Sequence, residues 1–147
     1  NNISSNPKSY YMDLHLESDF QDKNNQTRFT PPVQVIYALK TALDELVKEG
    51  IDNRYNRIKK NRQRLLKSIS KFGFISIGNE KTHSKIITSI KLPKNYNFHE
   101  IFNFMYKNNI TIYPSKSEDN TFRISTIGDL NLEDIDYVIR KFKEYAK

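Results

Sequence analysis

The amino-acid sequence predicts an α+β fold, in which a small antiparallel or mixed sheet of about four strands is covered by helices. Three observations lead to this prediction. Apolar residues recur with helical spacing in four segments, short β-branched runs lie between them, and Gly, Pro or Asn separates most of the segments. The expected order is helix, helix, strand, strand, helix, strand, strand, helix, and 147 residues are enough for one domain with a hydrophobic core.

The first half of the chain is expected to be irregular and then helical. Residues 1–30 are polar, and residues 17–28, rich in Asp, Asn and Gln, are predicted to form a loop. Two prolines then precede a predicted helix over 32–49, which Thr30 is placed to cap. The apolar stripe of this helix is wide, which predicts packing on two sides. A second helix, over 52–71, carries apolar residues on one face and eight Lys or Arg residues on the others.

The second half alternates strands with helices. Asn97 and Asn131 are predicted to cap two amphipathic helices, and residues 115–120 to form a polar loop. The predicted strands cover residues 74–77, 85–92, 110–113 and 121–126.

Composition narrows the classes of partner. With 24 Lys and Arg against 17 Asp and Glu, the net charge is +7, so an anionic ligand or a nucleic acid must be considered. The absence of Cys excludes disulfides and thiolate sites, and fits the cytoplasmic location that we predict. No apolar run approaches the ~20 residues of a membrane span, so no membrane partner is expected. His15, His83 and His99 lie too far apart in sequence to predict a metal site.

Arg123 is the residue most clearly suited to a chemical role. Alternation in its predicted strand directs Phe122 and Ile124 to one side, and Arg123 and Ser125 to the other. A guanidinium held on a strand presents two parallel donors to a carboxylate, phosphate or phosphonate. The alternative is an edge-strand arginine that lies in solvent. Alone, the residues contain no complete catalytic set.

Four segments resemble the class V aminotransferases of the pyridoxal-phosphate fold type I superfamily. Within that family the likeness is strongest to the 2-aminoethylphosphonate–pyruvate transaminases. The resemblance covers nearly the whole chain, in the right order. The segments are Arg28-Phe29-Thr30-Pro31-Pro32-Val33, Ile86-Ile87-Thr88-Ser89, Ile112-Tyr113-Pro114 and Thr121-Phe122-Arg123-Ile124, the last followed by Ile127-Gly128.

The resemblance implies roles for two residues. Arg123 matches the arginine that grips the carboxylate or phosphonate of the substrate, and Thr30 matches a threonine directed toward the cofactor phosphate of the partner subunit. Ser125 and Thr126 stand where the family commonly has Gly and Asn, which bears on the substrate more than on the arginine.

The resemblance also implies what the chain lacks. The Schiff-base lysine of the family is expected upstream of residue 1, so no catalytic residue is assigned here and the chain alone is expected to be inactive. Residues 1–30 would be the irregular end of a large domain or linker, and residues 31–147 the C-terminal small domain. The full-length protein would be a homodimer that holds pyridoxal 5'-phosphate, which the isolated chain is not expected to bind. Its substrates would be small amines and 2-oxoacids.

Other interpretations remain open at this level. The protein could be another class V enzyme of the alanine– or serine–glyoxylate type, and a substrate panel would distinguish the two. It could be a basic nucleic-acid-binding α+β module that uses residues 52–71, which would show steep salt dependence. It could also be a structural or dimerising domain with an exposed apolar helix over 32–49.

Overall fold

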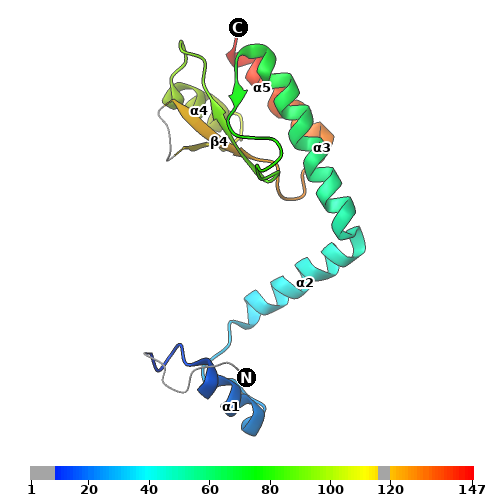
Figure 1. The fold of residues 1–147 in the computed structure, drawn as a ribbon, viewed down its shortest axis with the longest axis vertical. Helices are drawn as coiled ribbons and strands as arrows, with labels where there is room; N and C mark the ends of the chain where they lie inside the picture. The colour runs from blue at the N-terminus through cyan, green and yellow to red at the C-terminus, as the bar shows by residue number, and fades with distance from the viewer. Residues whose placement is uncertain (1–8, 116–119) are drawn as a thin grey trace. The chain divides into compact units, whose positions relative to one another are not determined.

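The computed structural model describes residues 9–115 and 120–147 (Figure 1). Residues 1–8 of the expected irregular start, and residues 116–119 of the expected polar loop, lie outside the described residues. The chain divides into two compact units, Asn1–Lys48 and Glu49–Lys147. The helix predicted over 32–49 therefore belongs almost entirely to the first unit.

The first unit begins with a helix that the sequence patterns did not predict. Helix α1 spans Leu14–Asn24, so the loop predicted over 17–28 is wrong for most of its length. The Asp13 carboxylate accepts hydrogen bonds from the backbone N–H groups of His15 and Leu16, each at 3.0 Å, and Asn25 ends the helix at φ 52°. The helix buries none of its residues. Local caps rather than an apolar stripe define it, and apolar periodicity does not detect such a helix.

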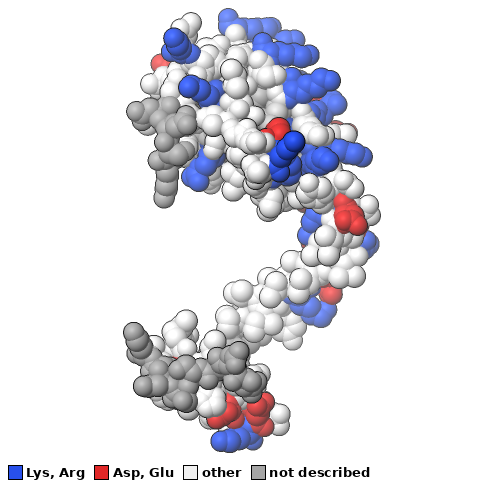
Figure 2. Space-filling view, in the orientation of Figure 1, with Lys and Arg blue, Asp and Glu red and all other residues white. Residues whose placement is uncertain are grey.

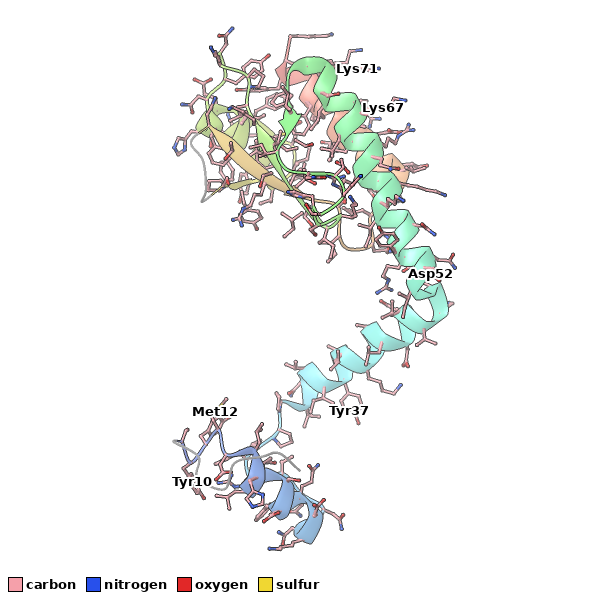
Figure 3. All side chains as sticks on the ribbon, in the orientation of Figure 1. Tyr10, Met12, Tyr37, Asp52, Lys67 and Lys71 are labelled. Atoms are coloured by element: carbon pink, nitrogen blue, oxygen red, sulfur yellow. The ribbon has the colours of Figure 1, made fainter. Side chains whose placement is uncertain are left out.

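Helix α2 spans Val33–Glu49, within one residue of the prediction. The backbone oxygen of Pro32 accepts the Ile36 N–H at 3.0 Å, so Pro32 occupies the N-cap position and the predicted cap at Thr30 is wrong. Within the part of the chain that the structure describes, no residue of α2 is buried. Its apolar stripe is exposed, including Tyr37, which Figure 3 labels.

The second unit is a two-layer α+β fold, as predicted. Its sheet has the order β1-β2-β4-β3, and all three pairings are antiparallel. Figure 1 shows α3 and α5 side by side. The elements are α3 (Ile51–Ile69), the 3-10 helix η1 (Ser70–Phe72), β1 (Ile75–Ser76), β2 (Ile87–Lys91), α4 (Phe98–Lys107), β3 (Tyr113–Pro114), β4 (Thr121–Ser125) and α5 (Leu132–Tyr145).

The strand predicted over 110–113 is wrong in its position. Ile110 and Ile112 are buried, but the Ile110 N–H donates to the Met105 oxygen at 2.9 Å and so closes the end of α4. Only Tyr113 and Pro114 pair with β4. The apolar alternation correctly predicted which side chains are buried. The backbone N–H of Ile110, however, is bonded to the end of α4 and does not pair with a strand.

One hydrophobic core holds this unit together. It combines apolar residues of the three helices with the inward face of the two central strands. Asn97 and Asn131 cap α4 and α5 as predicted, and Asn131 forms a reciprocal capping box with Asp134. The principal core residues are Leu65 and Ile69 of α3, Ile101 and Met105 of α4, Ile135 and Phe142 of α5, and Ile90, Phe122 and Ile124 of the sheet.

Candidate anion-binding site

Arg123 lies in the middle of β4, between two neighbouring strands. It is directly opposite Ser89 of β2 and Tyr113 of β3. Phe122 and Ile124 on either side of it are buried in the core, so Arg123 points to the other face of the sheet, as the alternation predicted. The side chain is half-buried rather than free in solvent.

The Arg123 guanidinium is the feature that marks this face as a candidate site. Its Nε is buried and has no hydrogen-bond partner, and no residue of the described chain forms a hydrogen bond or ion pair with the group. A buried donor without an acceptor costs about 1–3 kcal/mol and is uncommon in folded proteins. An anionic ligand would supply the missing acceptor, so the arrangement favours anion binding over the solvated alternative.

The outward face around Arg123 mixes apolar and polar groups. Ile75 and Tyr113 are 61% and 60% exposed, and Ile87 is also exposed. Ser89 is half-buried, and Lys91 follows it two residues along the same strand. Among the described residues that face outward from these four strands, none carries a carboxylate. The face is therefore electropositive and accessible in the second unit.

A second arginine supports the sheet from its inward side, and the sequence patterns did not identify it. Arg62 of α3 is buried, and its Nε donates to the Thr88 hydroxyl at 2.9 Å. Its two terminal nitrogens donate to the Glu80 carboxylate at 3.0 and 2.8 Å. Arg62, and then Lys85, lower the pKa of Glu80 from 4.5 to about 2. Arg62 could not be identified from the sequence, because nothing in a basic helix distinguishes a buried arginine from the solvated ones beside it.

A third network holds the segment that leaves β4. Arg57 donates to the backbone oxygens of Gly128 and Leu130 at 2.9 and 3.1 Å, and Asn61 donates to Leu130 at 2.8 Å. Glu49 accepts from Arg57 at 2.7 Å and from Arg54 at 2.6 Å. Hydrogen bonds from Arg57 and then Arg54 lower the pKa of Glu49 to about 2. These contacts tie the start of α3 to the segment beyond β4.

Several of the basic residues on the surface of α3 are engaged in ion pairs. Arg54, Arg57 and Arg62 are engaged as described, and Arg64 pairs with Asp136 of α5 at 2.6 Å. Exposed cations remain along the unit (Figure 2), among them Lys67 of α3 and Lys71 of η1, which Figure 3 labels. The four arginines suited to phosphate contacts are occupied by carboxylates, which weakens the nucleic-acid hypothesis. The expectation that nucleic acid is not a partner stays a prediction.

Thr30, the other predicted site residue, is exposed in the first unit. Arg28 fixes the chain just before it by donating to the backbone oxygens of Asp13 and Tyr10, each at 3.3 Å. The Arg28 guanidinium also lies 4.6 Å from the centre of the Tyr10 ring. The first turn of α2 holds no acidic residue. Thr30 and Arg123 thus belong to different units.

Two further expectations concern metals and membranes. Within residues 9–115 and 120–147, no group of three or more His, Cys, Asp or Glu side chains is arranged to hold a metal ion. No helix in that part of the chain has the length and apolar character needed to cross a membrane. The cytoplasmic location stays a prediction.

Comparison with known families identifies the class of protein. The sequence model described as "Aminotransferase class-V" matches residues 10–116, which is more than half of the chain. The chain belongs to the class V aminotransferase family.

Individual relatives are consistent with this assignment. The chain is 39% identical over 136 residues to a "2-aminoethylphosphonate--pyruvate transaminase" of Bacillus cereus, a match that covers 90% of this chain and 37% of the relative. The chain thus spans little more than a third of the length of the curated relatives it matches.

Solved structures share the fold at low sequence identity. An alanine–glyoxylate aminotransferase from Nostoc sp. superposes with a TM-score of 0.83 at 19% identity, covering 95% of this chain and 38% of its own. A PLP-bound phosphoserine aminotransferase from Trichomonas vaginalis gives 0.68 at 17% identity, covering 93% and 40%. These matches show that the fold of the chain is that of the corresponding part of an aminotransferase.

Proposed function

We propose that the complete protein is a pyridoxal-phosphate-dependent transaminase that moves the amino group of 2-aminoethylphosphonate to pyruvate, giving phosphonoacetaldehyde and alanine. The name of the relative at 39% identity supports this substrate pair. This chain would be its C-terminal part, with the cofactor-bearing lysine on a large domain upstream. The isolated chain would not catalyse the reaction.

Arg123 is the observation that carries the proposal. Its Nε is buried, the guanidinium lacks a described partner, and the residue stands on the outward face of the sheet. In the complete protein it would bind the phosphonate of the amino donor, and the carboxylate of the 2-oxoacid in the other half of the reaction. Two parallel N–H donors match two oxygens of either group and orient the substrate as well as holding it.

Thr30 is proposed to contact the cofactor. It offers an exposed hydroxyl ahead of a 17-residue helix whose first turn carries no negative charge, a setting that suits a phosphate group. The cofactor, when bound, would supply the electron-withdrawing ring that the reaction needs. The family resemblance implies that this contact crosses a homodimer, and on that support we propose that the complete protein is a dimer, with small amines and 2-oxoacids as its substrates.

The proposal is tested with the complete protein, 2-aminoethylphosphonate and pyruvate, by following the formation of alanine. Turnover with this pair, and much slower turnover with alanine or serine and glyoxylate, is the expected result. Efficient turnover with the glyoxylate pairs and none with the phosphonate would move the protein to the alanine– or serine–glyoxylate type. No turnover with any pair would overturn the transaminase assignment of the complete protein.

A further inference from the structure

We propose that Lys91 acts with Arg123 as a second cation of the anion site and strengthens its preference for a doubly charged phosphonate over a singly charged carboxylate. This inference rests on the proposed role of Arg123. In this proposal Lys91 has no role at a cofactor or at a reacting atom. It is a specificity-determining residue for the group that Arg123 binds.

The sheet register places the two cations near each other. Arg123 of β4 is directly opposite Ser89 of β2, and Lys91 is two residues further along β2. Residues in this diagonal relation on one face of an antiparallel pair lie roughly 7–8 Å apart, within reach of long side chains. Ile90 between Ser89 and Lys91 is buried in the core, so both of its neighbours point outward with Arg123.

Among the described residues, nothing engages the Lys91 ammonium group. It is exposed, and no described residue forms an ion pair or hydrogen bond with its ammonium group. The residues directly opposite it are Ile75 of β1 and Thr121 of β4, neither of which is charged. Some lysines of the chain are paired with carboxylates, as Lys85 is with Glu80, but Lys91 is not among them. The charge of Lys91 therefore adds to that of Arg123 on this face.

The selectivity between a phosphonate and a carboxylate comes from the difference in their charges. A guanidinium can hold two oxygens of a carboxylate or of a phosphonate, and its own charge already attracts the doubly charged group more strongly. The attraction to Lys91 scales with the charge of the ligand. For a ligand roughly 7–8 Å from the ammonium group, Coulomb's law in water gives about a 2.5-fold gain in affinity for a single charge and about a sixfold gain for a double charge. Salt would reduce both gains.

The test is an NMR titration of the Arg123 Nε–Hε signal in the 147-residue chain at low ionic strength. Methylphosphonate, at a pH where it is doubly charged, is compared with acetate. In the unchanged chain both anions should shift the signal, and methylphosphonate should bind more tightly. Lys91→Gln should weaken methylphosphonate binding about sixfold and acetate binding about 2.5-fold. Lys94→Gln, a matched loss of an exposed lysine in the turn after β2, should change the ratio of the two affinities far less.

Three results would overturn the inference, and each has a different meaning. If Arg123 responds to both anions but Lys91→Gln leaves the affinity ratio unchanged, Lys91 has no part in selectivity while Arg123 keeps its proposed role. If the Arg123 signal responds to neither anion, the anion-binding role of Arg123 fails and the inference fails with it. A Lys94→Gln variant that alters the ratio as much as Lys91→Gln would show a general effect of net charge and would also reject the inference.

Discussion

Arg62 and Arg123 show how the same residue type takes opposite roles on the two faces of one sheet. Arg62 lies on the inward side, and each of its three guanidinium nitrogens donates a hydrogen bond to Thr88 or Glu80. Arg123 lies on the outward side with a buried nitrogen and no described partner. The first arrangement stabilises the fold, whereas the second leaves binding capacity for a ligand.

Replacing Arg62 should therefore destabilise the second unit. Arg62→Ala would leave a cavity and an unsatisfied Thr88 hydroxyl, and we expect a loss of about 2–4 kcal/mol in the free energy of unfolding. Arg64→Ala is the matched control, because Arg64 and Asp136 form an exposed pair whose loss should cost less than about 1 kcal/mol. Urea unfolding followed by circular dichroism measures both. Equal losses in the two variants would contradict the structural role of Arg62.

The Glu80 carboxylate makes the stability of this unit depend on pH. Its folded-state pKa of about 2 lies below the ordinary value of 4.5. Its contribution to stability is thus complete above about pH 4.5 and is lost as the pH falls through 2. The stability difference between the unchanged chain and Glu80→Gln should be larger at about pH 6 than at about pH 2.5. A Glu80 carboxyl that titrates near 4.5 in an NMR experiment would contradict this account.

At the scale of elements, the sequence predicted well where one apolar stripe faces one core. The stripes of α3, α4 and α5 and the alternation of β2 and β4 satisfy that condition, and these elements were found within a few residues of their predicted bounds. Helix α1 and the position of β3 were missed, because caps and a helix terminus decide them. The burial of the Arg62 side chain depends on tertiary packing, and the diagonal position of Lys91 relative to Arg123 depends on strand register. Local sequence patterns contain neither kind of information.

Helices α2 and α3 should differ in local stability. α2 buries none of its residues, whereas α3 packs Leu65 and Ile69 into the core. A helix of 17 residues without tertiary contacts is marginal in water. In hydrogen exchange of the 147-residue chain, amides of α2 should exchange far faster than those around Leu65. Comparable protection in both helices would mean that α2 has a partner surface, such as a second copy of the chain.

At the scale of the whole molecule, the anion site and its supports lie within the second unit, while Thr30 belongs to the first. The chain spans 37% of the length of its B. cereus relative, so activity must be measured on the complete protein. We propose that this chain contributes to that activity the residue that binds the anionic end of the substrate.

The most direct measurement is kcat/KM for 2-aminoethylphosphonate in the complete protein with Arg123→Ala. Loss of a charged, hydrogen-bonded contact costs about 2–5 kcal/mol, so we expect kcat/KM to fall by roughly 30-fold to several thousand-fold. Arg140→Ala, which removes an exposed arginine of α5, is the control and should leave kcat/KM within about twofold. A complete protein that keeps its kcat/KM after Arg123→Ala would contradict the assignment of Arg123 as the substrate-binding group.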